Sequence, residues 1–136
     1  MYIGRHRLLP LQERALRELG VTVTRTIENL PTEPAALSTL LSELQKEGIE
    51  AAVTVALPPH LLAAVSARLT TLVFEMRSTT FQSSEAAEKW VAEKPEARTY
   101  IPGRPGEPVR GLEFIGVNKV RVIVESTRVW PQSASQ

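Results

Sequence analysis

Several basic and hydroxyl side chains of this sequence stand directly after stretches of apolar residues. Arg5-His6-Arg7 follows the opening stretch, Pro58-Pro59-His60 follows 51–57, and Arg77 with Ser78-Thr79-Thr80 follows 72–76. Guanidinium, imidazole and hydroxyl groups donate hydrogen bonds to phosphate oxygens, and a helix that opens at Pro58-Pro59 would add free backbone N–H groups. These residue types together predict a pocket for phosphate groups.

Each of these features also has a structural interpretation, which stays open at this stage. His6 could end a strand and face solvent, and His60 could be an exposed residue in the first turn of a helix. Ser78-Thr79-Thr80 has the β propensity of an ordinary strand end, and Arg104 could be a solvated loop residue. The sequence contains neither GxGxxG nor a Walker motif, which disfavours the common dinucleotide and nucleoside triphosphate sites.

The composition limits the ligands and the chemistry that the chain can use. Of its 136 residues, 16 are Lys or Arg and 15 are Glu, and there is no Asp and no Cys. The formal net charge of +1 argues against binding of duplex DNA but leaves room for a small anionic ligand. Without Cys or Asp, we expect no thiolate site and no carboxylate cage for a metal, and we predict neither a metal nor a cofactor.

The sequence also shows no sign of a membrane protein or a secreted protein. No apolar run is long enough to cross a bilayer, and basic residues interrupt the only early apolar stretch where a signal peptide would lie. We therefore expect a cytoplasmic protein without a membrane partner.

Strand patterns alternate with helix patterns along the chain. Apolar spacing predicts helices that begin at Pro10, at Pro34, at Pro58-Pro59 and at Ser83 or Ser84, and Gly20 and Gly48 should end the first two. We predict strands over 2–4, 21–27, 51–57, 72–76, 112–117 and 120–129. The last two could instead be one long bulged strand, and the Pro/Gly-rich segment 101–108 is typical of a loop.

This alternation predicts one α/β domain over residues 1–130, followed by a disordered tail over 131–136. The domain should contain a Rossmann-like, mostly parallel sheet with flanking helices and a C-terminal β extension. In such sheets, ligands bind outside the carboxyl ends of the strands, where the strand order reverses. Both histidines are predicted at this edge, together with Arg5, Arg77 and the three hydroxyl residues.

The opening residues Gly4-Arg5-His6-Arg7-Leu8-Leu9-Pro10-Leu11-Gln12 resemble the start of small Rossmann-like ancillary proteins of type III CRISPR systems. Those proteins begin with a short strand, followed by a His-x-Leu-x-Pro-x-Gln-like stretch that enters a helix. The later layout is similar too, with a strand that ends in hydroxyl residues, a short helix, a Pro/Gly loop and a closing strand near Leu112.

The resemblance implies a protein that acts on cyclic oligoadenylate, the ring-shaped second messenger of type III CRISPR defence. It favours a metal-independent ring nuclease for cyclic tetra-adenylate that works as a homodimer and switches the response off. A protein that binds the messenger without cutting it, for sequestration or sensing, stays open as the alternative. So does an α/β domain for another phosphorylated metabolite.

The same resemblance suggests roles for individual residues. His6 would be the acid or base for attack by the ribose 2′-hydroxyl, with His60 as a second candidate. Arg104 would close over the ligand. The remaining residues would bind phosphate or ribose, or line the ligand site: Arg5, Gln12, Pro58, Arg77, Ser78, Thr79 and Thr80.

Overall fold

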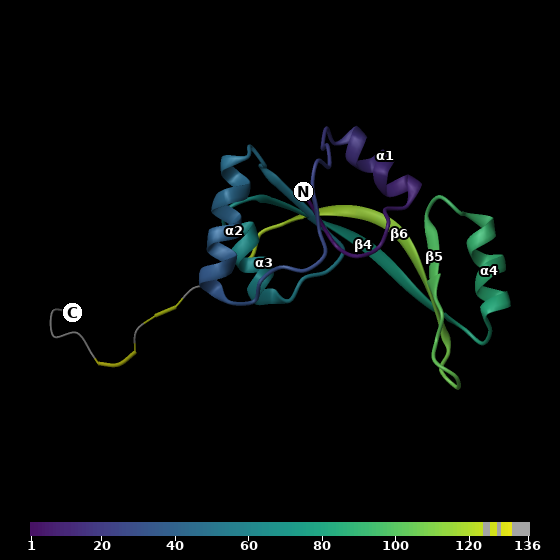
Figure 1. The fold of residues 1–136 in the computed structure, drawn as a ribbon. Coiled ribbons are helices and arrows are strands. Elements are labelled where there is room, and N and C mark those ends of the chain that lie inside the picture. The colour runs from purple at the N-terminus through teal and green to yellow at the C-terminus, as the bar shows by residue number, and fades with distance from the viewer. Residues whose placement is uncertain (124–125, 128, 132–136) are drawn as a thin grey trace.

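The computed structural model describes residues 1–123, 126–127 and 129–131, which form four helices and one six-stranded sheet (Figure 1). The helices are α1 (Pro10–Glu18), α2 (Pro34–Lys46), α3 (Pro59–Ser66) and α4 (Ser84–Glu93). The strands are β1 (Tyr2–Ile3), β2 (Thr26–Ile27), β3 (Ala51–Thr54), β4 (Thr70–Phe81), β5 (Arg98–Ile101) and β6 (Val109–Val120).

The strands are arranged in the order β2-β1-β3-β4-β6-β5. The first four of these are parallel, whereas β6 runs antiparallel to β4 and β5 runs antiparallel to β6. This arrangement confirms the predicted α/β fold, with a Rossmann-like, mostly parallel sheet and a C-terminal β extension. The chain passes from β1 to β2 on one side and later returns to β3 on the other, so the strand order reverses between β1 and β3.

Each face of the parallel sheet carries its own apolar core. Under α1, Leu16 packs against Tyr2 and Phe74, whose ring meets that of Phe114 edge to face at a centroid distance of 5.4 Å. Under α2 and α3, the core contains Leu41, Leu44, Val65 and other buried aliphatic side chains.

The predicted helix boundaries follow from backbone chemistry, since α1 and α2 begin with proline and are followed by Gly20 and Gly48 at φ values of 75° and 88°.

Three strands are shorter than the sequence predicts, and the first of them, β1, lacks only Gly4. The predicted strand 21–27 is wrong except at Thr26–Ile27, and the predicted strand 51–57 ends at Thr54. The neighbouring β1 is only two residues long, so β2 can pair with it only at Thr26 and Ile27. Val21 and Val23 pack against the core under α1 without joining the sheet, which explains their apolar alternation.

The strands β4, β6 and β5 form a protruding part of the sheet, which we call the arm. β4 continues to Phe81 instead of ending at Met76, and it pairs with β6 along this length. The alternative of one bulged strand is confirmed as far as Val120, because β6 continues through Asn118-Lys119 without a break and a register shift opposite Glu75/Met76 leaves Ile115 as the extra residue. The predicted strand 120–129 is wrong for its described residues beyond Val120. Of the predicted tail 131–136, only Pro131 belongs to the described residues.

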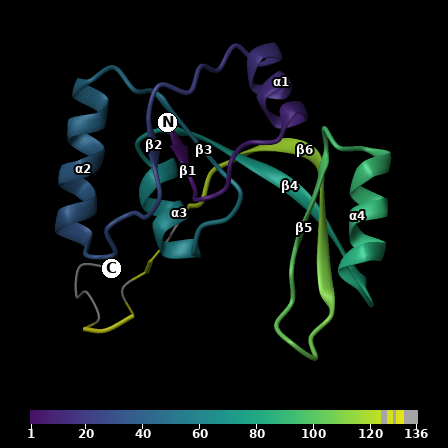
Figure 2. The ribbon, with the colours of Figure 1, turned by 45° about the vertical axis from the view of Figure 1, so that its right-hand side comes forward.

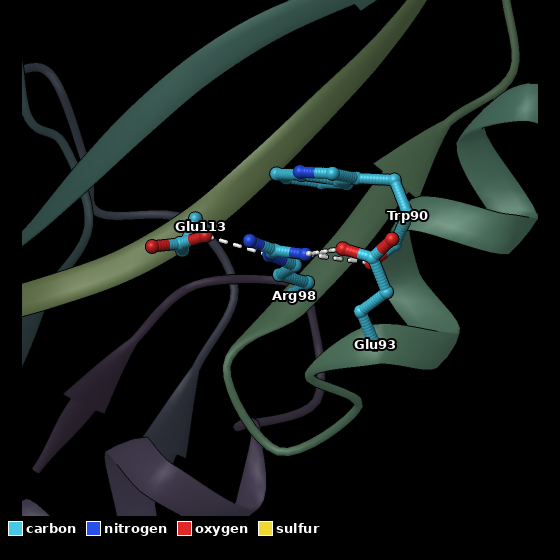
Figure 3. Close-up of polar contacts among 4 residues, drawn as sticks. All are labelled: Trp90, Glu93, Arg98 and Glu113. Atoms are coloured by element: carbon cyan, nitrogen blue, oxygen red, sulfur yellow. Dashed lines mark hydrogen bonds and ion pairs between the residues drawn. The ribbon is translucent and has the colours of Figure 1, made fainter.

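The arm ends in β5, a strand that the sequence analysis misses, and α4 covers one of its faces (Figure 2). Arg98 of β5 joins these elements (Figure 3). Its Nε donates to Glu113 Oε1 of β6 at 2.6 Å, and its Nη1 donates to the Trp90 carbonyl of α4 at 2.8 Å. Its guanidinium carbon also lies 4.4 Å from the centroid of the Trp90 ring. The side chains of Arg98 and Glu113 are only 11% and 15% exposed, so this pair is largely shielded from water.

The Arg98–Glu113 pair makes the stability of the arm depend on pH. The hydrogen bond from Arg98 lowers the pKa of the Glu113 carboxyl, and burial opposes this shift more weakly. A carboxyl whose pKa is lower in the folded state than in the unfolded chain stabilises the fold above its unfolded value, about 4.3. That contribution is lost as the pH falls through the lower folded value.

We therefore expect Glu113→Gln to lower the free energy of unfolding at neutral pH, because an amide cannot form the ion pair with Arg98. The difference in unfolding free energy between wild type and variant should shrink at acidic pH, because the protonated Glu113 carboxyl is then as uncharged as the amide that replaces it. Urea denaturation at about pH 7 and about pH 3 measures both effects. A difference of equal size at the two pH values would contradict this account.

Candidate functional site

A cavity of about 490 Å³ lies where the carboxyl ends of the parallel strands meet the arm. We call it the edge cavity. Its lining comes from the loop after β1, from α1, from the residue after β3, and from all three strands of the arm. The lining residues are Tyr2, His6, Arg7, Leu8, Leu9, Gln12, Val55, Met76, Thr99, Tyr100, Ile101, Pro102 and Leu112. The cavity thus lies beside the reversal of strand order, where ligands bind in sheets of this type.

The chain reaches this cavity by turning closely around the ring of Tyr2. A Cβ atom on Gly4 would lie 2.6 Å from Tyr2 Oη and 2.7 Å from Tyr2 Cζ, so only glycine fits without displacement. Burial raises the pKa of the Tyr2 phenol, and its hydroxyl donates to the His6 carbonyl at 2.9 Å. Tyr2 and Gly4 therefore hold the segment Arg5-His6-Arg7 at the end of β1.

The edge cavity combines apolar walls with a positive rim. Leu8 and Leu9 enter it from the α1 side, and Met76 and Leu112 enter it from the arm. Among the described residues that line it, Arg7 carries a permanent positive charge and none is acidic. A site of this composition suits a ligand that has a flat or apolar body and an anionic group.

His6 and Arg7 also border a second, more polar cavity of about 320 Å³. Arg5 lines this one, together with Glu13 and Glu28, and donates from Nη2 to Asn29 Oδ1 at 3.2 Å. The two cavities share Tyr2, His6, Arg7 and Leu8, so the basic segment forms a ridge between them. Arg5 therefore points to the charged side of the ridge, among acidic groups that compete with an anionic ligand.

His60 does not join His6. It lies in the first turn of α3 and lines a separate groove of about 330 Å³ between α2 and α3, with Leu37, Leu61 and Arg68. This groove belongs to the face of the sheet opposite α1. The two histidines thus follow strands that end at one edge, but α3 directs the second one onto the other face.

The segment Arg77-Ser78-Thr79-Thr80 lies inside β4, not after its end. Arg77 pairs in register with Glu113, whose carboxylate binds Arg98 beside α4, so Arg77 lies on the face covered by α4. Ser78 Oγ accepts a hydrogen bond from Arg110 Nε at 2.8 Å on the opposite face. Because β4 carries these four residues out along the arm, they do not line the edge cavity with His6.

Pro58 and Arg104 also lie apart from the edge cavity. Pro58 is the exposed N-cap residue of α3, and its carbonyl accepts from Leu61 and Leu62. Arg104 is exposed in the loop between β5 and β6, where its carbonyl accepts from the Glu107 N–H at 2.8 Å. That loop projects from the end of the arm (Figure 2).

The sequence analysis misses most of the cavity wall. Val55, Met76, Leu112 and the β5 residues Thr99 and Ile101 line the cavity together with the basic segment, although they are distant from it in sequence. The one local signal for β5 is the run of β-favouring residues Thr99-Tyr100-Ile101, which stands beside the Pro/Gly loop. Tyr100 also lines the cavity, but its hydroxyl donates to Glu88 Oε1 of α4 at 2.9 Å.

The fold and the cavity together define an α/β protein with a ligand-sized cavity at the switch point of a mostly parallel sheet. Comparisons with family models, curated proteins and solved structures gave no match. Among the described residues, no helix is long and apolar enough to span a membrane. In the same part of the chain, no three histidine or acidic side chains gather as metal ligands would.

We expect Gly4→Ala to lower the free energy of unfolding by about 1–3 kcal/mol, because the new methyl group collides with the buried Tyr2 ring. Gly116→Ala is the matched control in the same sheet, since its Cβ would meet only Glu75 Oε2 at 3.9 Å. Chemical denaturation of both variants tests the prediction. Equal stability of the two would show that Gly4 does not restrain the basic segment.

Proposed function

We propose that this chain binds cyclic oligoadenylate, with one adenylate unit in the edge cavity and its phosphate at the Arg7–His6 rim. The observation that carries the proposal is the position and composition of that cavity: apolar walls and a cationic rim at the switch point of the sheet. The choice of adenylate among phosphorylated ligands comes from the resemblance of the segment Gly4–Gln12 to type III CRISPR ancillary proteins.

The chemistry of the ligand matches the two parts of the cavity. An adenine ring has apolar faces that can pack between Leu9 and Met76, and ring nitrogens that accept hydrogen bonds. A phosphodiester carries a single negative charge, which the Arg7 guanidinium can bind through two parallel hydrogen bonds. The volume of about 490 Å³ lies within the range typical of small-molecule sites.

A ring of four identical adenylate units needs more binding surface than one such cavity. Two copies of the chain related by a twofold axis would present two edge cavities to one symmetric ring. We therefore propose a homodimer in which the carboxyl edges of the two sheets face a shared ligand.

Cleavage of the bound ring is a second candidate function, and the position of His6 favours it. The ribose 2′-oxygen would attack the adjacent phosphorus while the bond from phosphorus to the 5′-oxygen breaks. The 2′-hydroxyl loses a proton and the 5′-oxygen gains one, which leaves a 2′,3′-cyclic phosphate and a 5′-hydroxyl. An imidazole at the cavity rim can assist one of these proton transfers, and Arg7 can stabilise the charge on the phosphoryl oxygens.

We expect Arg7→Ala to weaken binding of cyclic tetra-adenylate by about ten- to a hundredfold, because a charge-assisted hydrogen bond to phosphate is lost. Arg77→Ala is the matched control and should leave the affinity unchanged, since Arg77 lies opposite Glu113 on the α4 face and outside the cavity lining. Isothermal titration in EDTA measures both. An equal loss in the two variants would contradict the placement of the ligand in the edge cavity.

For cleavage, we expect wild-type protein in EDTA to convert cyclic tetra-adenylate into linear products with 2′,3′-cyclic phosphate ends. His6→Ala should slow this reaction by about 10²–10⁴-fold, whereas His60→Ala should keep the wild-type rate because His60 lies in the α2–α3 groove. Chromatography of the products over time gives both rates.

The same assay separates the competing functions. An intact ring that co-elutes with the protein supports sequestration or sensing without cleavage. A ring that neither binds nor breaks, in the tetramer and then in the hexamer, overturns the proposal in favour of another phosphorylated ligand.

A further inference from the structure

Gln12 is a buried polar side chain in the wall of the edge cavity. It is 4% exposed and occupies the third position of α1. Its Oε1 accepts the Leu9 backbone N–H at 2.8 Å, the bond by which Glu or Gln at this position commonly caps a helix. Because only the carbonyl end of the amide can accept, this bond fixes the orientation of the whole group.

The other end of the same amide is a hydrogen-bond donor with little to bind. In the part of the chain that the structure describes, the recorded partner of Gln12 Nε2 is the Met76 sulfur at 3.7 Å, and a thioether is a weak acceptor. Both residues line the edge cavity. A strong acceptor on a ligand would therefore gain a hydrogen bond that the protein leaves largely unused.

We infer that Gln12 determines ligand specificity by donating an Nε2–H hydrogen bond to a ring nitrogen of a purine in the edge cavity. The inference rests on the proposed function, because it requires a base-bearing ligand. The cap holds the amide so that Gln12 presents a donor and no acceptor. Hence a base that places a C–H group or an N–H group at that point is rejected, since the buried amide loses its partner or meets a second donor.

A purely structural role for Gln12 predicts different behaviour, and one substitution separates the roles. Gln12→Glu keeps a carboxyl oxygen for the Leu9 N–H, as glutamate caps helices in the same way, but it removes the donor. Gln82→Glu is the charge control, because Gln82 is exposed between β4 and α4 and outside the cavity lining.

The test is a double-mutant cycle between Gln12 and the base. Wild type, Gln12→Glu and Gln82→Glu are titrated with cyclic tetra-adenylate and with rings made from 1-deaza-, 3-deaza- or 7-deazaadenosine, and thermal unfolding confirms that each variant is folded. One deaza ring should bind wild type and Gln82→Glu at least about tenfold more weakly than the natural ring. Gln12→Glu should bind the natural ring more weakly and should no longer distinguish that deaza ring from it.

The possible failures are distinguishable from one another. Equal binding of all four rings by wild type, or a deaza effect that persists in Gln12→Glu, overturns the role of Gln12 and leaves the proposed function standing. If wild type binds no ring, the proposed ligand fails, and the same titration with AMP and its three deaza analogues decides the inference. A deaza effect on AMP that depends on Gln12 would support it, and the absence of binding or of that effect would overturn it.

Discussion

The structure around the candidate site depends on how tightly β1 is enclosed. This strand has only two residues, yet it hydrogen-bonds to β2 on one side and to β3 on the other, and Tyr2 and Ile3 are buried under different helices. The Tyr2 ring then serves as the support around which the chain turns at Gly4, and its hydroxyl binds the His6 carbonyl. A short strand with few hydrogen bonds can thus hold the basic segment in one place, because its side chains are fixed by both cores.

The opposite wall of the cavity is held by a different kind of interaction. β5 is an edge strand of four residues that pairs on one side with β6. Arg98 adds side-chain contacts to this pairing, because it pairs with Glu113, binds the Trp90 carbonyl and stacks on the Trp90 ring. Phe81 and Trp90 also pack closely over Gly111, where a Cβ would lie 2.7 Å from each ring. The arm therefore presents Thr99, Ile101 and Leu112 to the cavity from a braced sheet instead of from a loop.

The sequence was informative where a local rule decides the structure. Proline at the first helical position and glycine after the last turn located α1 and α2, and the alternation of elements indicated the parallel half of the sheet. The strand-end rule also placed His6 beside the cavity. The prediction failed where partners distant in sequence decide the outcome. β4 extends past Met76 because β6 is present to pair with it, and no property of Arg77-Ser78-Thr79-Thr80 alone reveals that partner.

His60 shows a second limit of reasoning from strand ends. Two segments can follow parallel strands at one edge and still diverge, because each helix must return over one face or the other. α1 returns over the face with Tyr2, whereas α3 returns over the face with Ile3, and their first turns are separated by the sheet. The position of a residue after a strand therefore predicts the edge of the sheet at which it lies. The handedness of the following connection is needed to predict on which face of the sheet it lies.

Binding and cleavage make different demands on this arrangement, and the geometry meets the demands of binding more fully. Binding needs a shaped cavity, a cation at its rim and a directed polar group in its wall, which the apolar lining, Arg7 and Gln12 provide within one chain. Cleavage by two proton transfers is fastest with both an acid and a base, and among the described residues that line the cavity His6 is the single imidazole. A nuclease built on this site would thus gain most of its rate from holding the 2′-oxygen in line with the phosphorus, with His6 assisting one transfer. Positioning of that kind depends on the walls of the cavity, so in such a nuclease the arm and α1 would matter as much as the imidazole itself.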